Sequence, residues 1–205
     1  MALRAAAQSS AADLAARGVL SHHSLGTPSP LRRYRRCGGT GRRVGEVLGV
    51  GPSFDDIWLA WEASASHAAV IDADGWRRFG VAAVELPGGL VLVVLLLGNS
   101  ALDGVRTEPG WANVTIVAEL VAVDGAPPTA ARPPLLLGWN GAHLSGPAAD
   151  AAVAISWYPS APYVRIQVPF DGDPAWLLVG VGTREEVGGA AADYTDRLLI
   201  EAAGE

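Results

Sequence analysis

Three polar side chains in the N-terminal half of the chain are of the types that bind metal ions or move protons. His22, followed by His23, comes directly after a stretch with helical spacing, and His67 ends a tryptophan-rich stretch. Between them, Glu46 stands in a run of apolar residues and glycine, 44–51. A carboxylate in such surroundings needs a partner, because burying an unpaired charge is costly. Two imidazoles and a carboxylate (His22, His67 and Glu46) could form a hydrogen-bonded cluster or bind a divalent metal such as zinc.

The spacing of these residues does not by itself select a ligand cluster. The positions of His22, Glu46 and His67 are more than 20 residues apart, and no two histidines lie four residues apart on one predicted helix. Unrelated histidines at the surface or at helix ends would give the same pattern. The residues alone therefore leave both interpretations open.

The composition excludes several classes of protein. The chain has 205 residues, of which 50% are hydrophobic and 18% charged, and its net charge is −6. This length provides the core of one large domain or of two domains of about 100 residues. The low charge content is untypical of a disordered chain. Nucleic acid is an unfavourable partner, because phosphate binding needs a basic face.

Cysteine content and apolar runs add further limits. The single cysteine excludes an internal disulfide and a multi-cysteine zinc site. The longest apolar run, 90–97, is under half of the roughly 20 residues that a membrane helix needs, so no transmembrane segment is predicted. The first residues contain no signal peptide pattern. A basic patch over 32–43 is interpreted as a solvated face without a ligand.

Periodicity predicts helices and a hairpin in the first half. Apolar residues at helical spacing predict a helix over 2–17 and another over about 54–66, the second opened by a capping box at Ser53. Two β-rich runs, 79–86 and 89–98, are separated by a turn signal and predict a hairpin. Together these elements predict an α+β unit over residues 1–98.

The second half has the pattern of an antiparallel β domain, interpreted as a small sandwich over 111–205. A polar, turn-rich stretch over 99–110 is predicted to be a linker. The predicted strands are 114–123, 135–137, 153–157, 163–170 and 176–181. Residues 193–203 are assigned to a closing helix.

Five short motifs follow one another in residues 1–98. They are Ser21-His22 after an alanine-rich helix, a glycine-containing loop, Gly45-Glu46, the series Trp61, Ser64 and His67, and Phe79-Gly80-Val81. In this order they resemble the bacterial branch of the CAP superfamily, also called SCP-like, which groups cysteine-rich secretory, antigen 5 and pathogenesis-related proteins. The resemblance implies an α-β-α sandwich with a surface cleft lined by histidines and acidic residues.

Carried over by position, the resemblance implies that His22, Glu46 and His67 line the cleft. Glu62 is a loose match for the second glutamate of the family. The family motif Gly-Glu-Asn-Ile is here Gly45-Glu46-Val47-Leu48, so the asparagine is missing. The first helix of the family and its secretion signal would precede residue 1. We expect the chain to start downstream of its true beginning, because losing a helix would expose the apolar face it covers.

Three functional hypotheses follow. The first is a non-catalytic, extracytoplasmic CAP-like module that binds a small ligand, a divalent metal or a cell-envelope component through the His22, Glu46 and His67 cleft. The second is a metal-assisted hydrolase in the same cleft, with Glu46 as general base. The third is a structural or adhesion protein that acts through its β domain. The resemblance implies a secreted or cell-surface location, whereas the missing signal peptide leaves a cytoplasmic one open.

Overall fold

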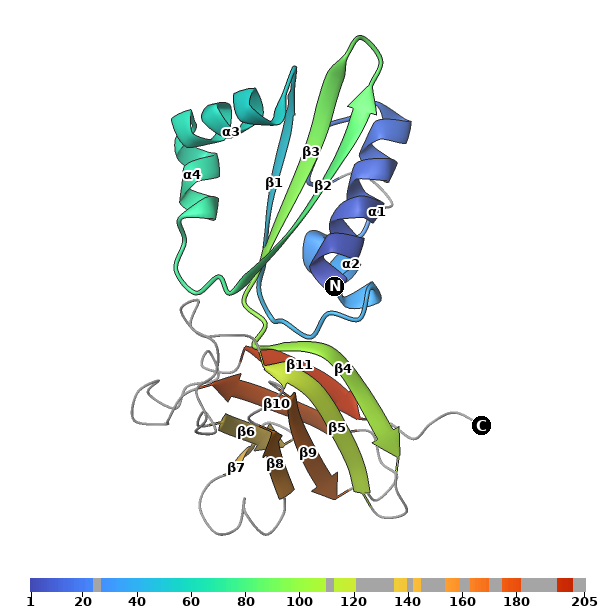
Figure 1. Cartoon of the computed structure of the whole chain (residues 1–205), viewed down its shortest axis with the longest axis vertical. Helices are drawn as coiled ribbons and strands as arrows, with labels where there is room; N and C mark the ends of the chain where they lie inside the picture. The colour runs from blue at the N-terminus through green and yellow to red at the C-terminus, as the bar shows by residue number, and fades with distance from the viewer. Residues whose placement is uncertain are drawn as a thin grey trace. The chain divides into compact units, whose positions relative to one another are not determined.

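The structure is a computed structural model of the chain (Figure 1), and its elements form two compact units. Unit 1 comprises residues 1–39 and 43–99, and unit 2 comprises residues 40–42 and 100–205. The residues that the structure describes are 1–23, 27–109, 113–120, 135–139, 142–144, 154–158, 163–169, 175–181 and 195–200.

Unit 1 is a three-stranded antiparallel sheet with helices on both faces (Figure 1). The sheet has the order β1 (Val44–Gly51), β3 (Leu90–Gly98), β2 (Arg78–Leu86). One face packs against α1 (Ala2–Arg17) and α2 (Pro30–Arg36). The other face packs against α3 (Phe54–Ala63) and α4 (Ala65–Ile71). The predicted hairpin is confirmed as the β2–β3 pair. Among the described residues, no helix combines the length and apolar character that crossing a membrane requires.

Helix α1 lies close to the sheet because small residues face each other across the contact. Its buried stripe includes Ala7 and Leu14, as the predicted helix over 2–17 requires. A Cβ atom on Gly80 of β2 would lie 2.4 Å from the backbone nitrogen of Arg4, so only glycine fits there. The helix ends at Gly18, whose left-handed backbone (φ 62°) is favourable for glycine.

Helix α3 approaches the opposite face of the sheet through another glycine contact. A Cβ atom on Gly49 would lie 2.3 Å from Ile57 Cγ2 and 2.9 Å from Trp61 Nε1. The Trp61 indole donates a hydrogen bond to the Leu48 carbonyl oxygen at 2.9 Å. The helix predicted over 54–66 is confirmed as far as Ala63; Ser64 has an extended backbone, and a second helix, α4, follows it.

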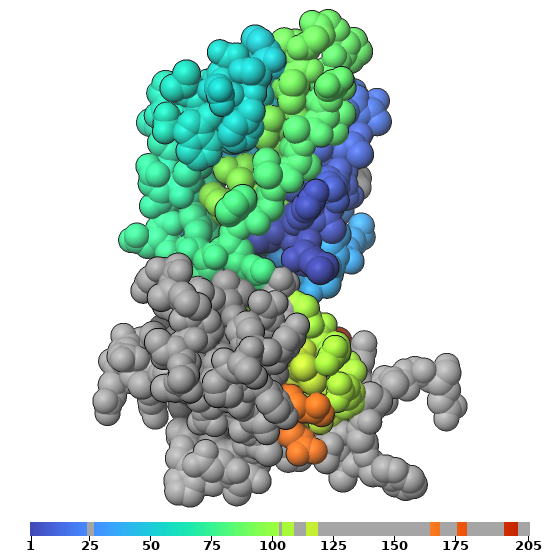
Figure 2. Space-filling view, in the orientation of Figure 1, coloured from blue at the N-terminus to red at the C-terminus, as the bar shows by residue number. Residues whose placement is uncertain are grey.

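Strand β2 forms one edge of the sheet, and its outward side chains are only partly covered. Phe79 is 71% exposed and Val81 is 39% exposed, whereas Ala82, on the other side of the strand, is buried. Figure 2 shows the green surface of the hairpin between the two helical layers of unit 1. Helices α3 and α4 therefore do not cover the whole of their face of the sheet.

The described residues of unit 2 form two four-stranded antiparallel sheets. Their orders are β4-β5-β9-β8 and β11-β10-β6-β7. The strands are β4 (Leu102–Pro109), β5 (Asn113–Leu120), β6 (Leu135–Trp139), β7 (Ala142–Leu144), β8 (Ala154–Tyr158), β9 (Tyr163–Pro169), β10 (Ala175–Val181) and β11 (Asp196–Ile200). The antiparallel strands expected in this half are confirmed over their described residues. Residues 121–123, 153 and 170 of the predicted strands lie outside the described residues.

Two sequence-based predictions for unit 2 are wrong. The expected linker over 99–110 contains β4, an edge strand whose exposed positions carry the polar residues that suggested a loop. The helix expected over 193–203 is replaced in its described part by β11. In β11, Asp196, Leu198 and Ile200 are buried and alternate with exposed residues, which is the period of a strand.

A buried carboxylate ties the short segment 40–42 into unit 2. Asp196 is fully buried and accepts four hydrogen bonds: from Thr40 Oγ1 at 2.5 Å, Ser100 Oγ at 2.5 Å, the Ala101 backbone nitrogen at 2.7 Å and Thr195 Oγ1 at 2.7 Å. None of these donors carries a charge. The carboxylate is therefore stabilised by hydrogen bonds rather than by an ion pair.

Replacing Asp196 by asparagine tests this interpretation. The amide group would point its own N–H groups at two of the four donors, and we expect unit 2 to lose about 2 kcal/mol or more of stability. Hydrogen exchange of the β10 and β11 amides measures the loss. The matched control is Glu108→Gln, which removes an exposed charge paired with Arg165 and should change stability by less than about 1 kcal/mol. Equal effects of the two variants would contradict the interpretation.

Candidate functional site

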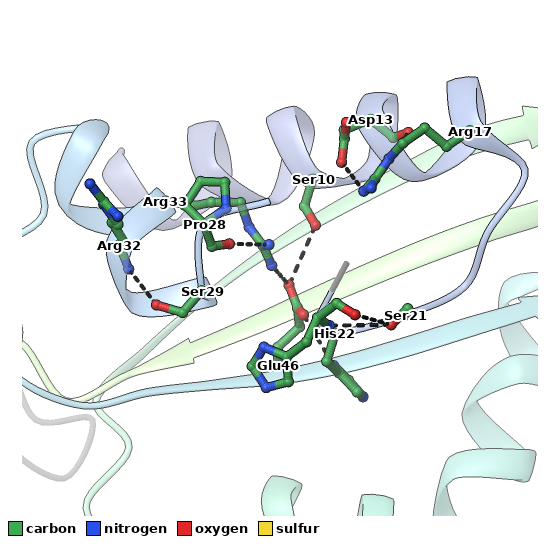
Figure 3. Close-up of polar contacts among 11 residues, drawn as sticks. Ser10, Asp13, Arg17, Ser21, His22, Pro28, Ser29, Arg32, Arg33 and Glu46 are labelled. Atoms are coloured by element: carbon green, nitrogen blue, oxygen red, sulfur yellow. Dashed lines mark hydrogen bonds and ion pairs between the residues drawn. The ribbon is translucent and has the colours of Figure 1, made fainter. Parts of the chain in front are cut away.

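Glu46 is the centre of a polar cluster inside unit 1 (Figure 3). Its side chain is only 2% exposed. One carboxylate oxygen, Oε1, lies 3.0 Å from Nδ1 of His22. The other, Oε2, forms an ion pair with Arg33 Nη2 and accepts a hydrogen bond from Ser10 Oγ at 3.4 Å. Three segments of unit 1 therefore converge on one carboxylate.

The alternation of β1 directs Glu46 toward α1 and α2. Leu48, two residues further on, packs in the core that contains α1, whereas Val47 packs in the core that contains α3. Residues two apart in a strand share a face, so Glu46 lies on the same face as Leu48. Ser10 belongs to the buried stripe of α1 and meets it there.

Arg33 reaches Glu46 from the short helix α2. Ser29 caps this helix by accepting a hydrogen bond from the Arg32 backbone nitrogen at 3.3 Å, and Pro30 occupies the first turn. The Arg33 side chain is 8% exposed, and its Nη1 donates to the Pro28 carbonyl oxygen at 2.8 Å. The guanidinium is thus held from two sides and compensates the buried negative charge.

His22 is the exposed member of the cluster. Its side chain is 44% exposed, while its Nδ1 contacts the buried carboxylate. An ionised carboxylate only accepts hydrogen bonds, so Nδ1 donates, and in the neutral ring Nε2 carries a free lone pair. Glu46 therefore fixes both the orientation of the ring and the nitrogen that stays available. An imidazole held in this way can accept a hydrogen bond, take up a proton or bind a metal ion.

The structure does not bring His67 and Glu62 to this cluster, contrary to the expected cleft. His67 lies on α4, beside Val70 and Ile71, which pack on the α3 side of the sheet. The sheet therefore separates His67 from Glu46. His67 is half-buried, and its Nδ1 has no hydrogen-bond partner among the described residues. Glu62 is exposed on α3, on the same far side.

The metal site expected from His22, His67 and Glu46 is not formed. Within the described ranges, no three histidine, cysteine, aspartate or glutamate side chains are grouped so that they could hold a metal ion. The physical reason is the two-residue period of β1, which directs Glu46 to one face while α4 covers the other. His22 and Glu46 are the two predicted residues that do meet.

Sequence reasoning misses Arg33 and Ser10. The basic run over 32–43 predicts a solvated face, yet Arg33 is buried. The apolar surroundings of Glu46 predict that it has a partner, but they do not indicate which cation supplies it. Ser10 could be found from its spacing, since it lies seven residues after Leu3 on the apolar stripe of the first helix.

Substituting Arg33 tests whether the ion pair holds this face of unit 1 together. Arg33→Met leaves the buried Glu46 charge without its cation, and we expect a loss of about 3 to 5 kcal/mol in the stability of unit 1. The double variant Arg33→Met with Glu46→Leu removes both charges and should recover most of the loss. Hydrogen exchange of the β1 and β3 amides measures both.

The control is Arg32→Met, which changes an exposed arginine of the same helix and should shift the stability by no more than about 0.5 kcal/mol. A loss below about 1 kcal/mol for Arg33→Met would show that the pair does not stabilise the unit.

No family model matches the sequence, and no curated protein matches it. Among solved structures, the chain is similar to an outer surface protein from Borrelia burgdorferi, with 24% sequence identity and a TM-score of 0.42. The match covers 47% of this chain and 71% of that chain.

Proposed function

We propose that unit 1 is a non-catalytic, CAP-like binding module that acts outside the cytoplasm and binds a small polar ligand through His22. The order of the motifs from Ser21-His22 to Phe79-Gly80-Val81 supports the family and the location. The helix, sheet and helix layers of unit 1 agree with the architecture that this family resemblance implies. The main supporting observation is that the buried Glu46 carboxylate holds the half-exposed imidazole of His22 in one orientation.

One nitrogen of the His22 ring contacts a protein group, and the other is available for a ligand. In the described part of the chain, no protein group forms a hydrogen bond with Nε2, while Nδ1 lies 3.0 Å from Glu46. A buried ion pair is a costly way to fix a surface side chain if the only result is stability, because apolar residues of similar size often do as well. The presence of the pair is better explained by the positioning of His22 for a ligand.

The geometry favours binding over the hydrolase hypothesis. A metal-assisted reaction at the expected cleft requires His22 and His67 to converge on one ion. These residues lie on opposite faces of the sheet. Glu46 is engaged by Arg33, Ser10 and His22, so it is not free to accept a proton from water as a general base. The adhesion hypothesis for the β domain stays a prediction.

The chemistry of the site defines the kind of ligand. A lone pair on Nε2 accepts a hydrogen bond from a hydroxyl or N–H group. Sugars and peptides of a cell envelope carry such donors, in agreement with the envelope component expected from the resemblance. N-acetylglucosamine and D-alanyl-D-alanine are suitable probes, because they present hydroxyl and N–H donors on small frames.

Nuclear magnetic resonance titration of the full chain with each probe tests the proposal. We expect at least one probe to shift the His22 ring signals with saturation. His22→Phe keeps an aromatic ring but removes the acceptor, so it should weaken binding at least about tenfold, which corresponds to one lost hydrogen bond. The matched control is His23→Phe, which changes the neighbouring exposed histidine and should leave the affinity unchanged.

Two results would overturn the proposal. One is the absence of a saturable shift with either probe up to about 10 mM, beyond which affinities fall below the range of specific binding. The other is an equal loss of affinity in the His22 and His23 variants, which would place the contact elsewhere. The dispersion of the backbone amide signals shows in each case whether the variant is folded.

A further inference from the structure

A second polar feature of unit 1 is a pocket of about 240 Å³ between α1 and the beginning and end of α2. The side chains that matter for its chemistry are those of Ser9, Asp13, Thr27, Arg33, Arg36 and Cys37. His22 does not line it. Arg33 belongs to both features, but an inference about this pocket does not rest on a contact of His22.

Several hydrogen-bond donors of the pocket have no partner in the part of the chain that the structure describes. Among the described residues, none forms a hydrogen bond or ion pair with the side chains of Ser9, Thr27 and Arg36, all of which line the pocket. Two hydroxyl groups and one guanidinium are therefore available to a ligand. Arginine presents its N–H groups in a planar fork that matches the oxygens of carboxylates and phosphates.

The charges around the pocket favour an anion. Asp13 is the acidic group in the lining, and it forms an ion pair with Arg17. Arg33 is paired with Glu46. The two arginines of the lining are Arg33 and Arg36. Among the described residues, Arg36 is the one without a counter-ion. Helix α2 carries no acidic residue, so this part of an otherwise acidic chain is locally positive.

The size and donor set of the pocket select a small tetrahedral anion. A volume of about 240 Å³ is below that of pockets for drug-sized ligands, so the pocket encloses only a small chemical group. A carboxylate offers two oxygens, whereas a phosphate group offers more oxygens and a higher charge to the guanidinium and the two hydroxyls. We propose that this pocket binds the phosphate group of a small soluble molecule, with Arg36 as its main charged contact.

The single cysteine of the chain provides a direct measurement. Cys37 lines the pocket and is partly exposed, so a bound anion should slow its alkylation. The reagent is iodoacetamide, because it is uncharged and its approach does not depend on the local field. Inorganic phosphate and glycerol phosphate are the probes, each compared with sodium chloride at equal ionic strength. We expect saturable protection by both, at concentrations at least about tenfold lower than those at which acetate protects.

Variants of two neighbouring arginines distinguish binding in the pocket from diffuse attraction to a basic surface. Arg36 and Arg35 are both exposed on α2, but only Arg36 lines the pocket. Arg36→Gln should weaken the protection by phosphate at least about tenfold, and Arg35→Gln, with the same change of charge, less than about twofold. Thr27→Val should weaken it as well, because it removes one of the two hydroxyls.

Three results would overturn the inference. Equal losses in the Arg36 and Arg35 variants would indicate diffuse attraction, and equal protection by acetate would remove the preference for phosphate. Protection by vesicles containing phosphatidic acid, without protection by free phosphate or glycerol phosphate, would mean that the basic helix docks on a lipid surface instead. The His22→Phe variant should retain full protection, so a failure here is distinguishable from a failure of the proposed function.

Discussion

The buried charge of Glu46 is the constraint on which the α1 and α2 side of unit 1 depends. A carboxylate that is 2% exposed requires compensation of several kcal/mol, and three neighbours contact it. Ser10 contributes from α1, Arg33 from α2, and His22 from the segment between them. The position of His22, in the described part of the segment that follows α1, is therefore fixed by its contact with the Glu46 carboxylate.

Unit 2 contains a buried carboxylate as well, but it is stabilised in another way. Asp196 accepts hydrogen bonds from four neutral donors, whereas Glu46 is paired with a guanidinium. Neutral donors such as Ser100 and Thr40 are small and lie on fixed backbone, so they define where chain segments cross. A guanidinium on a long side chain reaches further and allows its partner to present an exposed group such as His22.

The sequence predicts those elements whose signals are local. Helix α1, the β2–β3 hairpin and the start of α3 at Ser53 follow from spacing, turn residues and a capping box. Strand β4 is missed because the polar residues of an edge strand look like a loop, and β11 because five residues carry too little periodicity.

The meeting of His22 with Glu46 is predicted, but His67 is misplaced, since no sequence pattern shows which face of a sheet a later helix will cover. Arg33 is missed because burial of one arginine in a basic run depends on tertiary contacts alone.

The membership of residues 40–42 in unit 2 has a consequence for biosynthesis. The backbone nitrogen of Arg197 donates to the Thr40 carbonyl oxygen at 3.0 Å, so a residue that leaves the ribosome early pairs with one translated more than 150 positions later. Unit 1 can form its sheet as soon as Gly98 has emerged, but this segment stays without its backbone partners Thr195 and Arg197 until β11 is complete. Joining such distant parts of the chain is slow. Completion of unit 2 is accordingly the late step, and a cut between residues 98 and 99 would separate the segment from the strand that holds it.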